Sequence, residues 1–173
     1  VFGGIVTFVG ILGTLQKGPV SSVLYKPSVT YRGDYWRAGW RMFINNPLFG
    51  VGLDRYGANF RFYRDQTQVS HRGPNIVSNA AHSIPIQLAA TGGIFLFLTY
   101  FSLTLFIAWR SLIALKSTQG MAQITVATIF GAWLAYQAQS LISIDNIGIA
   151  VWGYLLGGAL VGLSTFKTTN HSY

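Results

Sequence analysis

Apolar residues along this chain gather in long runs, which one extended polar segment interrupts. The most complete run, residues 83–110, carries no charged side chain before Arg110, and about 20 such residues in a helix cross the roughly 30 Å hydrocarbon core of a bilayer. Residues 120–142 and 147–166 form two further runs, and residues 1–16 form a shorter one. We interpret the shorter run as the end of a truncated transmembrane helix. The pattern predicts an all-α integral membrane protein with about four transmembrane helices.

The polar segment, residues 17–81, is predicted to be one long loop that contains a short amphipathic helix over residues 34–46. Three aromatic side chains recur on one face of this helix and two arginines share another face: Trp36, Trp40 and Phe43, and Arg37 and Arg41. Asp34 is expected to cap the start of the helix, and Pro47 is expected to stop it. Tryptophan and arginine on one short helix favour a position in the membrane interface.

Two motifs follow this helix in the loop. In PLFGVGLDRYG, residues Gly50, Gly52 and Gly57 permit turns and close backbone approach, so the motif either wraps a ligand or serves as a plain turn. In NFRFYR, aromatic rings alternate with Arg61 and Arg64. Such a segment offers rings for stacking on a sugar and guanidinium groups for phosphate, or it anchors the loop in the interface.

The last two apolar runs contain small and polar residues at positions that suggest packing. Glycines lie about one turn apart on the final run: Gly153, Gly157, Gly158 and Gly162. This spacing lets helices approach closely in lipid. Polar side chains gather at the end of the preceding run: Gln137, Gln139, Ser140 and Ser143. We expect them at the depth of His82, where they either line a site or bond between helices.

Charge at the ends of the runs predicts the topology. Arg110, Lys116 and Lys167 flank short connections, which the positive-inside rule places in the cytoplasm. The turn at Asp145 lacks positive charge and should lie outside. The long loop then faces outward as well, and its many basic residues do not contradict this because the rule is weak for loops longer than about 60 residues.

Composition supports the membrane assignment. The chain has 173 residues, of which 51% are hydrophobic and only 9% charged, whereas about a quarter are charged in soluble domains. The net charge of +8 lies mostly in the aromatic-rich loop, which favours phosphate-bearing lipid over nucleic acid as a partner. Cysteine is absent, which excludes a disulfide framework. Because the chain opens on Val1 within an apolar run, we expect a fragment of a longer polytopic protein whose N-terminal helices are partners of this part.

His82 is the candidate catalytic residue. It lies just before the uncharged run, with Ser83 at the predicted cap and Pro85 in the first turn. The positive end of the helix dipole disfavours imidazolium there, and a neutral imidazole at a wet membrane surface is suited to general-base catalysis. The alternative is an interfacial polar residue with a satisfied hydrogen bond.

The other ionisable residues limit the chemistry. The three histidines show no paired spacing and the chain has only four carboxylates, so a divalent-metal site or a paired-carboxylate glycosidase is not expected. We predict a reaction without metal or cofactor. One base, many arginines and many aromatic rings fit transfer of a group from a phosphate leaving group, because guanidinium forks stabilise developing diphosphate charge.

These motifs resemble those of the O-antigen ligase and polymerase-like membrane glycosyltransferases. The resemblance rests on YRGDYW with Arg32, on NPLFGVGLDRYG, on AHSIPIQLAATGG with ten residues between His82 and Gly93, and on QSLISID. The first resembles the periplasmic arginine motif of the family, and the third resembles its histidine-to-glycine motif. The family often has Asn directly after this histidine, where Ser83 stands here. A hydroxyl can cap or orient much as the amide does.

The resemblance implies transfer of a glycan from an undecaprenyl-diphosphate-linked donor to an acceptor hydroxyl, on the outer face of the bacterial inner membrane. It implies that His82 is the base and that Arg32 contacts the donor diphosphate. The substrate-binding candidates are Arg32, Arg37, Arg61, Arg64, Arg72 and Trp36, and the structural motif residues are Pro47, Gly50, Gly52 and Gly93.

The acceptor and the reaction class stay open at this point. Ligation to a lipid, polymerisation of glycan repeats and transfer to protein use the same chemistry. An alternative function is that of a transporter related to inorganic-carbon transport proteins. The absence of charged residues inside the predicted spans argues against it. A non-catalytic membrane scaffold is the third.

Overall fold

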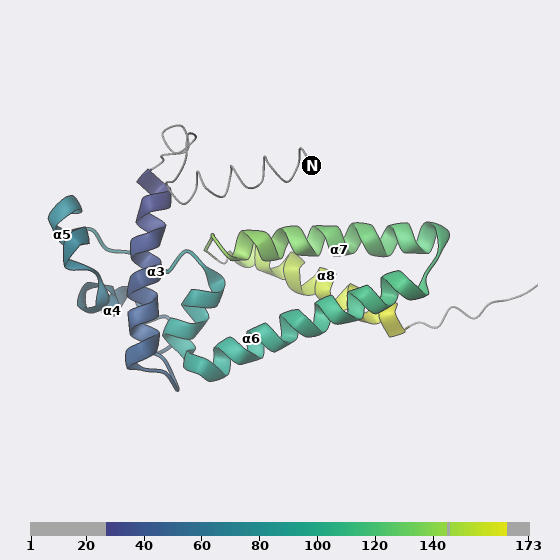
Figure 1. The fold of residues 1–173 in the computed structure, drawn as a ribbon, viewed down its shortest axis with the longest axis horizontal. Helices are drawn as coiled ribbons and strands as arrows, with labels where there is room; N and C mark the ends of the chain where they lie inside the picture. Colours follow the sequence, from purple (N-terminus) through teal and green to yellow (C-terminus); the bar gives the residue numbers. More distant parts are fainter. Residues whose placement is uncertain (1–26, 145, 166–173) are drawn as a thin grey trace, which may run out of the picture.

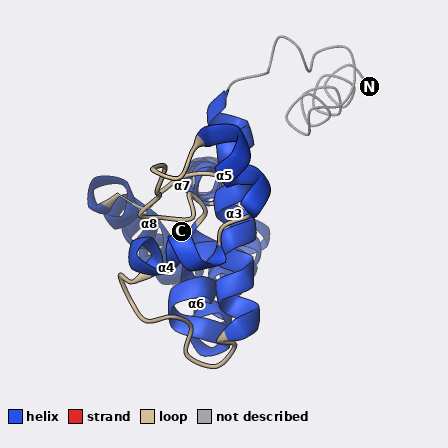
Figure 2. Cartoon of the chain, turned by 90° about the vertical axis from the view of Figure 1, so that its left-hand side faces the viewer, coloured by secondary structure: helices blue, strands red, loops and turns tan. Residues whose placement is uncertain are grey.

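The computed structural model describes residues 27–144 and 146–165, and this part of the chain consists of helices and loops without a strand (Figures 1 and 2). The helices are α3 (Pro27–Asn45), α4 (Tyr56–Tyr63), α5 (Gln66–Arg72), α6 (Ile84–Ser117), α7 (Gly120–Ser140) and α8 (Ile147–Thr165). The expected all-helical class is confirmed for these residues. The predicted span over residues 1–16, the turn residue Asp145 and the basic tail at Lys167 lie outside them.

The helices form two packed parts. The long part of α6 runs beside α7 and α8, while α3 stands across one end of this bundle with α4 and α5 beyond it (Figure 1). A buried cluster within the bundle includes Trp133, Ile107 and Leu160. A second cluster joins α3, α4 and the start of α6, and its members are Ala38, Met42, Tyr56, Phe60, Ala81 and Ala90.

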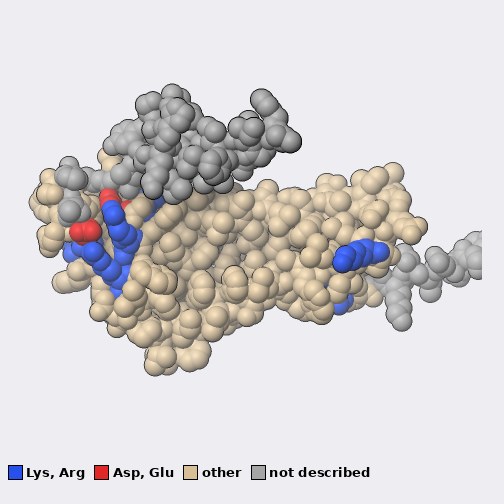
Figure 3. Space-filling view, in the orientation of Figure 1, with Lys and Arg blue, Asp and Glu red and all other residues tan. Residues whose placement is uncertain are grey.

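Two of the described helices, α6 and α8, are long and apolar enough to cross a membrane. On the face shown in Figure 3, basic side chains gather at the two ends and the surface between them carries no charge. This distribution suits a bundle with a hydrocarbon belt, because charged side chains are costly at the bilayer centre. The protein is therefore a membrane protein with two candidate spans in the described part.

Helix α7 has 21 residues but is not among the candidate spans. Its polar side chains are Gln123, Thr125, Thr128, Tyr136, Gln137, Gln139 and Ser140. They lower its hydropathy although the helix packs against both α6 and α8. The expected span over residues 120–142 consequently stays a prediction, as do the count of four spans and the sidedness of the long loop.

Helix α6 extends further than expected. The predicted span ended at Arg110, with a connection up to Lys116, but the helix continues to Ser117 and the Thr118 backbone N–H donates to Ala114 O at its end. No proline or glycine breaks residues 110–117, so the helical pattern simply continues. Arg110 is held against α8, where its guanidinium donates to the hydroxyl and the carbonyl of Ser164 at 2.8 and 3.2 Å.

A sharp bend divides α6 at Gly93, where φ is 67° and ψ is −163°. The first turns of the helix lie beside α3, and the remainder runs with α7 and α8 (Figure 1). Only glycine adopts this backbone region readily. The bend thus places the start of α6, and the residues just before it, against α3.

The loop over residues 47–52 fills the gap that this bend opens. Val51 N–H donates to Ala90 O at 2.9 Å, Gly52 N–H donates to Thr91 O at 3.1 Å, and Ile94 N–H donates to the carbonyl of Pro47 at 2.8 Å. A broken helix leaves these backbone groups without intrahelical partners, and the loop supplies them. The NPLFGVGL motif and the end of the histidine-to-glycine motif are therefore joined by backbone hydrogen bonds.

Helix α3 begins earlier than the predicted helix over residues 34–46. Asp34 lies inside it and pairs with Arg37 instead of capping its start. The helix ends at Asn45, just before Pro47, as expected. Ala38 and Met42 form its buried face, whereas Trp40 is 54% exposed. Of the predicted aromatic face, Trp40 is thus exposed while Trp36 and Phe43 are half-buried.

The glycines of α8 divide into two kinds. A Cβ at Gly153 would overlap the Tyr136 ring, and one at Gly157 would lie 2.8 Å from Ile107 Cδ1. These two positions allow the close helix approach that the spacing predicted. Gly158 and Gly162 have no such neighbour among the described residues, so close packing at these two positions stays a prediction.

Candidate functional site

His82 lies in the turn that leads into α6, outside the helix itself. Its φ is +55°, a left-handed conformation in which histidine is enriched among non-glycine residues. Ser83 occupies the N-cap position with Pro85 in the first turn, but the Ser83 side chain makes no capping hydrogen bond. The turn is instead closed by Gln87, whose Oε1 accepts from the Ala81 N–H at 2.8 Å. The expected serine cap is thus replaced by a glutamine.

Helix α3 holds the His82 turn from the other side. The imidazole stacks on the Tyr35 ring, with centroids 5.3 Å apart and planes inclined by 26°. The Trp36 indole N–H donates to the His82 carbonyl at 3.4 Å. Tyr56 OH donates to the Tyr35 carbonyl at 2.6 Å, which ties this helix to α4. Three aromatic residues therefore fix the position of the imidazole.

The environment of His82 favours the neutral imidazole. Partial burial lowers the pKa of His82 below its ordinary value of 6.5, and the positive charge of Arg32 lowers it further. Arg32 lies on α3 and His82 precedes α6, so the two sequence candidates meet only because these elements pack together. Burial also raises the pKa of the Tyr56 hydroxyl, so that this group stays a hydrogen-bond donor at neutral pH.

Two adjoining cavities share His82 in their walls. One of about 390 Å³ is lined by Asp54, Asn79, Ala80, His82, Ser83, Ile84, Gln87, Leu88, Ser143 and Ile144. The other, of about 550 Å³, is lined by His82, Ser143, Ile144, Asn146, Ile147 and Ile149. Both volumes lie in the range of small-molecule sites. The turn between α7 and α8 thus reaches His82, and the expected placement of Ser143 near this histidine is confirmed.

The other polar residues of that group are used in helix packing. Tyr100 OH donates to Gln137 Oε1 at 2.9 Å and lies 3.3 Å from Ser140 Oγ. Of the two predicted roles, bonding between helices is therefore the one that the structure gives to Gln137 and Ser140. Neither residue lines the cavities at His82.

The structural motif residues all lie at the bend of α6. Gly50 has φ +64°, and a Cβ there would lie 2.5 Å from the Thr91 carbonyl carbon. A Cβ at Gly93 would overlap the Leu48 carbonyl. Gly52 and Pro47 supply an N–H and a carbonyl to the hydrogen bonds described above. These residues shape the base of the site and do not line its cavities.

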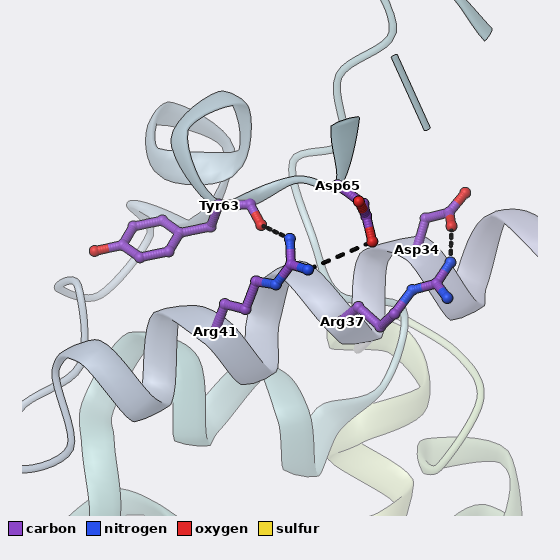
Figure 4. Close-up of polar contacts among 5 residues, drawn as sticks. All are labelled: Asp34, Arg37, Arg41, Tyr63 and Asp65. Atoms are coloured by element: carbon purple, nitrogen blue, oxygen red, sulfur yellow. Dashed lines mark hydrogen bonds and ion pairs between the residues drawn. The ribbon is translucent and has the colours of Figure 1, made fainter. Parts of the chain in front are cut away.

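Two arginines of α3 have carboxylate partners close by. Arg37 pairs with Asp34, and the Arg41 guanidinium lies 3.4 Å from both the Asp65 carboxylate and the Tyr63 carbonyl (Figure 4). Together with Trp36 and Trp40, they line a separate shallow hollow of about 390 Å³. The carboxylates partly neutralise them, which makes Arg32 the better candidate for a diphosphate.

The remaining arginine candidates lie away from His82. The Arg64 guanidinium donates to the carbonyls of Pro74 and Ile76 at 2.9 Å each, and so holds the loop that leads to the site. Arg61 is exposed on α4. Neither residue lines the two cavities. The side chain of Arg72 lies outside the described residues.

Sequence reasoning missed Asp54, Asn79, Gln87 and Tyr35. Asp54 has φ +57° and follows two glycines of the PLFGVGLDRYG motif, which is a signal for a special turn. Gln87 lies four residues after the N-cap, one turn on, from where a side chain can reach back to the turn before the helix. The described residues contain no group of three or more His, Cys, Asp or Glu side chains that could hold a metal. The absence of a metal stays a prediction.

Comparison with known proteins identifies one family. Residues 1–101, more than half of the chain, match the profile of the family described as O-Antigen ligase. No curated protein and no solved structure gives a significant match. The matched region contains α3, α4, His82 and the bend at Gly93.

Proposed function

Since this chain belongs to the O-antigen ligase family, we propose that it transfers a glycan from an undecaprenyl-diphosphate-linked donor to an acceptor hydroxyl, at the outer face of the inner membrane. The observation that carries the proposal is the pairing of His82 and Arg32. The imidazole lies in the wall of two cavities, and its pKa is lowered partly by the Arg32 charge. The Arg32 charge is thus near enough to act on the imidazole and to favour its neutral form.

His82 is the general base of this reaction. Its imidazole takes the proton of the acceptor hydroxyl while the acceptor oxygen forms a bond to the anomeric carbon of the donor sugar. The bond from that carbon to the diphosphate oxygen breaks, and the diphosphate leaves with the electron pair. Because the pKa of His82 is lowered, the imidazole is in the proton-accepting form at neutral pH. The stacked ring of Tyr35 keeps it oriented.

Arg32 stabilises the leaving group. The charge on the diphosphate grows as the bond breaks, and a guanidinium can bind two phosphate oxygens in a planar fork. Lysine offers one compact charge in place of that fork. The loop and the start of α6 then lie outside the cytoplasm, at the level of the lipid headgroups.

The proposal is tested in the purified full-length protein with a lipid-linked glycan donor. His82→Ala should abolish transfer while abundance stays near normal, and His71→Ala serves as the matched control. Near-full activity of His82→Ala, or equal loss in both variants, would rule out His82 as the base.

The arginine role needs its own pair of variants. Arg32→Lys should lower the transfer rate on the order of 100-fold, as removal of one transition-state donor does. Arg41→Lys is the control on the same helix, since Arg41 pairs with Asp65. Excess EDTA should change nothing. Loss of activity with EDTA together with near-normal Arg32→Lys would refute the metal-free mechanism.

A further inference from the structure

The smaller cavity at His82 has an unusual wall. Asp54, Asn79, Gln87 and Ser143 contribute a carboxylate, two amides and a hydroxyl to the cavity that His82 also lines. Among the described residues, no lysine or arginine lines it. The wall therefore contains hydrogen-bonding groups of both kinds but no positive charge.

This charge pattern argues against a diphosphate as the ligand of the smaller cavity. A diphosphate placed beside the Asp54 carboxylate would meet a negative charge, and none of the described arginines, Arg32 included, lines that wall to offset it. In the larger cavity, isoleucine side chains make up half of the wall, which suits a hydrocarbon better than a sugar. The smaller cavity fits a neutral, hydroxyl-rich molecule.

Two of its polar groups are available for such a molecule. Asp54 is exposed and forms no ion pair or hydrogen bond with any other described residue. Gln87 uses its Oε1 for the Ala81 N–H, and its NH₂ group has no partner in the described part of the chain. A carboxylate accepts hydrogen bonds and an amide NH₂ donates them, which matches neighbouring hydroxyls of a sugar ring.

We propose that this cavity is the acceptor subsite, that it binds a pyranose sugar, and that Asp54 is a positioning residue that holds a hydroxyl neighbouring the reactive one. The inference rests on the proposed function, because the reactive hydroxyl must lie beside His82. The acceptor loses its proton to the imidazole, and Asp54 only accepts a hydrogen bond. The volume of about 390 Å³ accommodates one sugar ring.

The backbone near Asp54 takes part in the hydrogen bonds that join the loop over residues 47–52 to the bend of α6. It follows Gly52, whose N–H is bonded to Thr91 O, and the Arg55 N–H donates back to the Gly52 carbonyl at 3.2 Å. The carboxylate is thus attached to the backbone that supports the start of α6 and the His82 turn. The backbone on both sides of Asp54 is therefore anchored.

The test measures sugar binding by saturation-transfer NMR in the full-length protein in detergent. The probes are the methyl glycosides of glucose, galactose, mannose, rhamnose and N-acetylglucosamine. Asp54→Asn preserves size and tolerates the positive φ but removes the charge. It should weaken binding of the best probe about tenfold, as loss of a charged hydrogen bond does.

Asp65→Asn is the matched control, because Asp65 lies in the same loop but pairs with Arg41. It should bind the probe as the wild type does. If the wild type binds none of the five glycosides, or if the two variants bind equally, the subsite proposal is wrong. His82→Ala separates this proposal from the transfer mechanism: it should bind the probe but fail to transfer. Transfer by His82→Ala would overturn the mechanism and leave the binding result standing.

Discussion

Replacing Gly93 by alanine is expected to disrupt the hydrogen-bonded contact between the loop over residues 47–52 and the bend of α6. The backbone there has φ 67° and ψ −163°, a region in which a residue with a side chain is strained by about 1–3 kcal/mol. The new Cβ would also overlap the Leu48 carbonyl. The loop must then move, and three backbone hydrogen bonds between it and α6 are put at risk.

The magnitude follows from these contacts. Each hydrogen bond contributes about 1 kcal/mol, so that strain and lost bonds together amount to about 4–6 kcal/mol. Gly131→Ala is the matched control, because Gly131 lies within α7 and a Cβ there has no neighbour within 4 Å among the described residues. Alanine should change stability there by less than about 1 kcal/mol.

The assay is the free energy of unfolding of the full-length protein, measured by SDS titration in mixed micelles. Transfer activity should fall with Gly93→Ala as well, because the first turns of α6 set the place of His82. If Gly93→Ala unfolds within about 1 kcal/mol of Gly131→Ala, the bend does not depend on glycine and the reasoning fails.

Three further predictions concern pH, the loop and the topology. The acid limb of the transfer rate should have its midpoint below pH 6.5, because the pKa of His82 is lowered from that ordinary value. Arg32→Gln should move this acid limb to higher pH, since it removes a positive charge that opposes protonation, and an unmoved limb in the pH profile would contradict the coupling. Arg64→Ala should destabilise the loop by about 1–3 kcal/mol and increase its cleavage by protease, because two hydrogen bonds to backbone carbonyls are lost; unchanged cleavage would argue against this role. Single cysteines at Ser70 and Ser117 should differ in labelling by an impermeant thiol reagent, with Ser70 labelled from outside and Ser117 protected, and the reverse pattern would overturn the topology.

The sequence alone located the main elements of the described part. The uncharged run after His82 became α6, and the last apolar run, residues 147–166, became α8. These are local properties, because a long apolar run can satisfy its backbone groups in lipid only as a helix. The boundaries were less predictable. Asp34 looks like a cap but lies within α3, which continues through Gly33, and its carboxylate pairs with Arg37. Arg110 looks like the end of a span but lies within α6, since no proline or glycine follows it before Ser117.

The candidate site was predictable in its residue types and not in its geometry. The histidine, the arginine and the glycine motif could each be recognised from spacing and resemblance. The sequence around these residues does not indicate that the loop over residues 47–52 fills the bend at Gly93. The backbone hydrogen bonds between this loop and α6 join segments that are far apart in the chain. Tyr35 was likewise hidden, since its stacking on His82 depends on how α3 lies against α6.

Composition and order of residues determined that this protein is helical, membrane-associated and similar to one ligase family, because hydropathy and short motifs are read one segment at a time. The tertiary structure decided which charges face the site. It brought the charge of Arg32 within reach of His82, gave Arg37 and Arg41 carboxylate partners, and brought Asp54 to the cavity wall. The physical reason is that the electrostatic field at a residue depends on distances in space, which the packing of α3 against a bent α6 establishes.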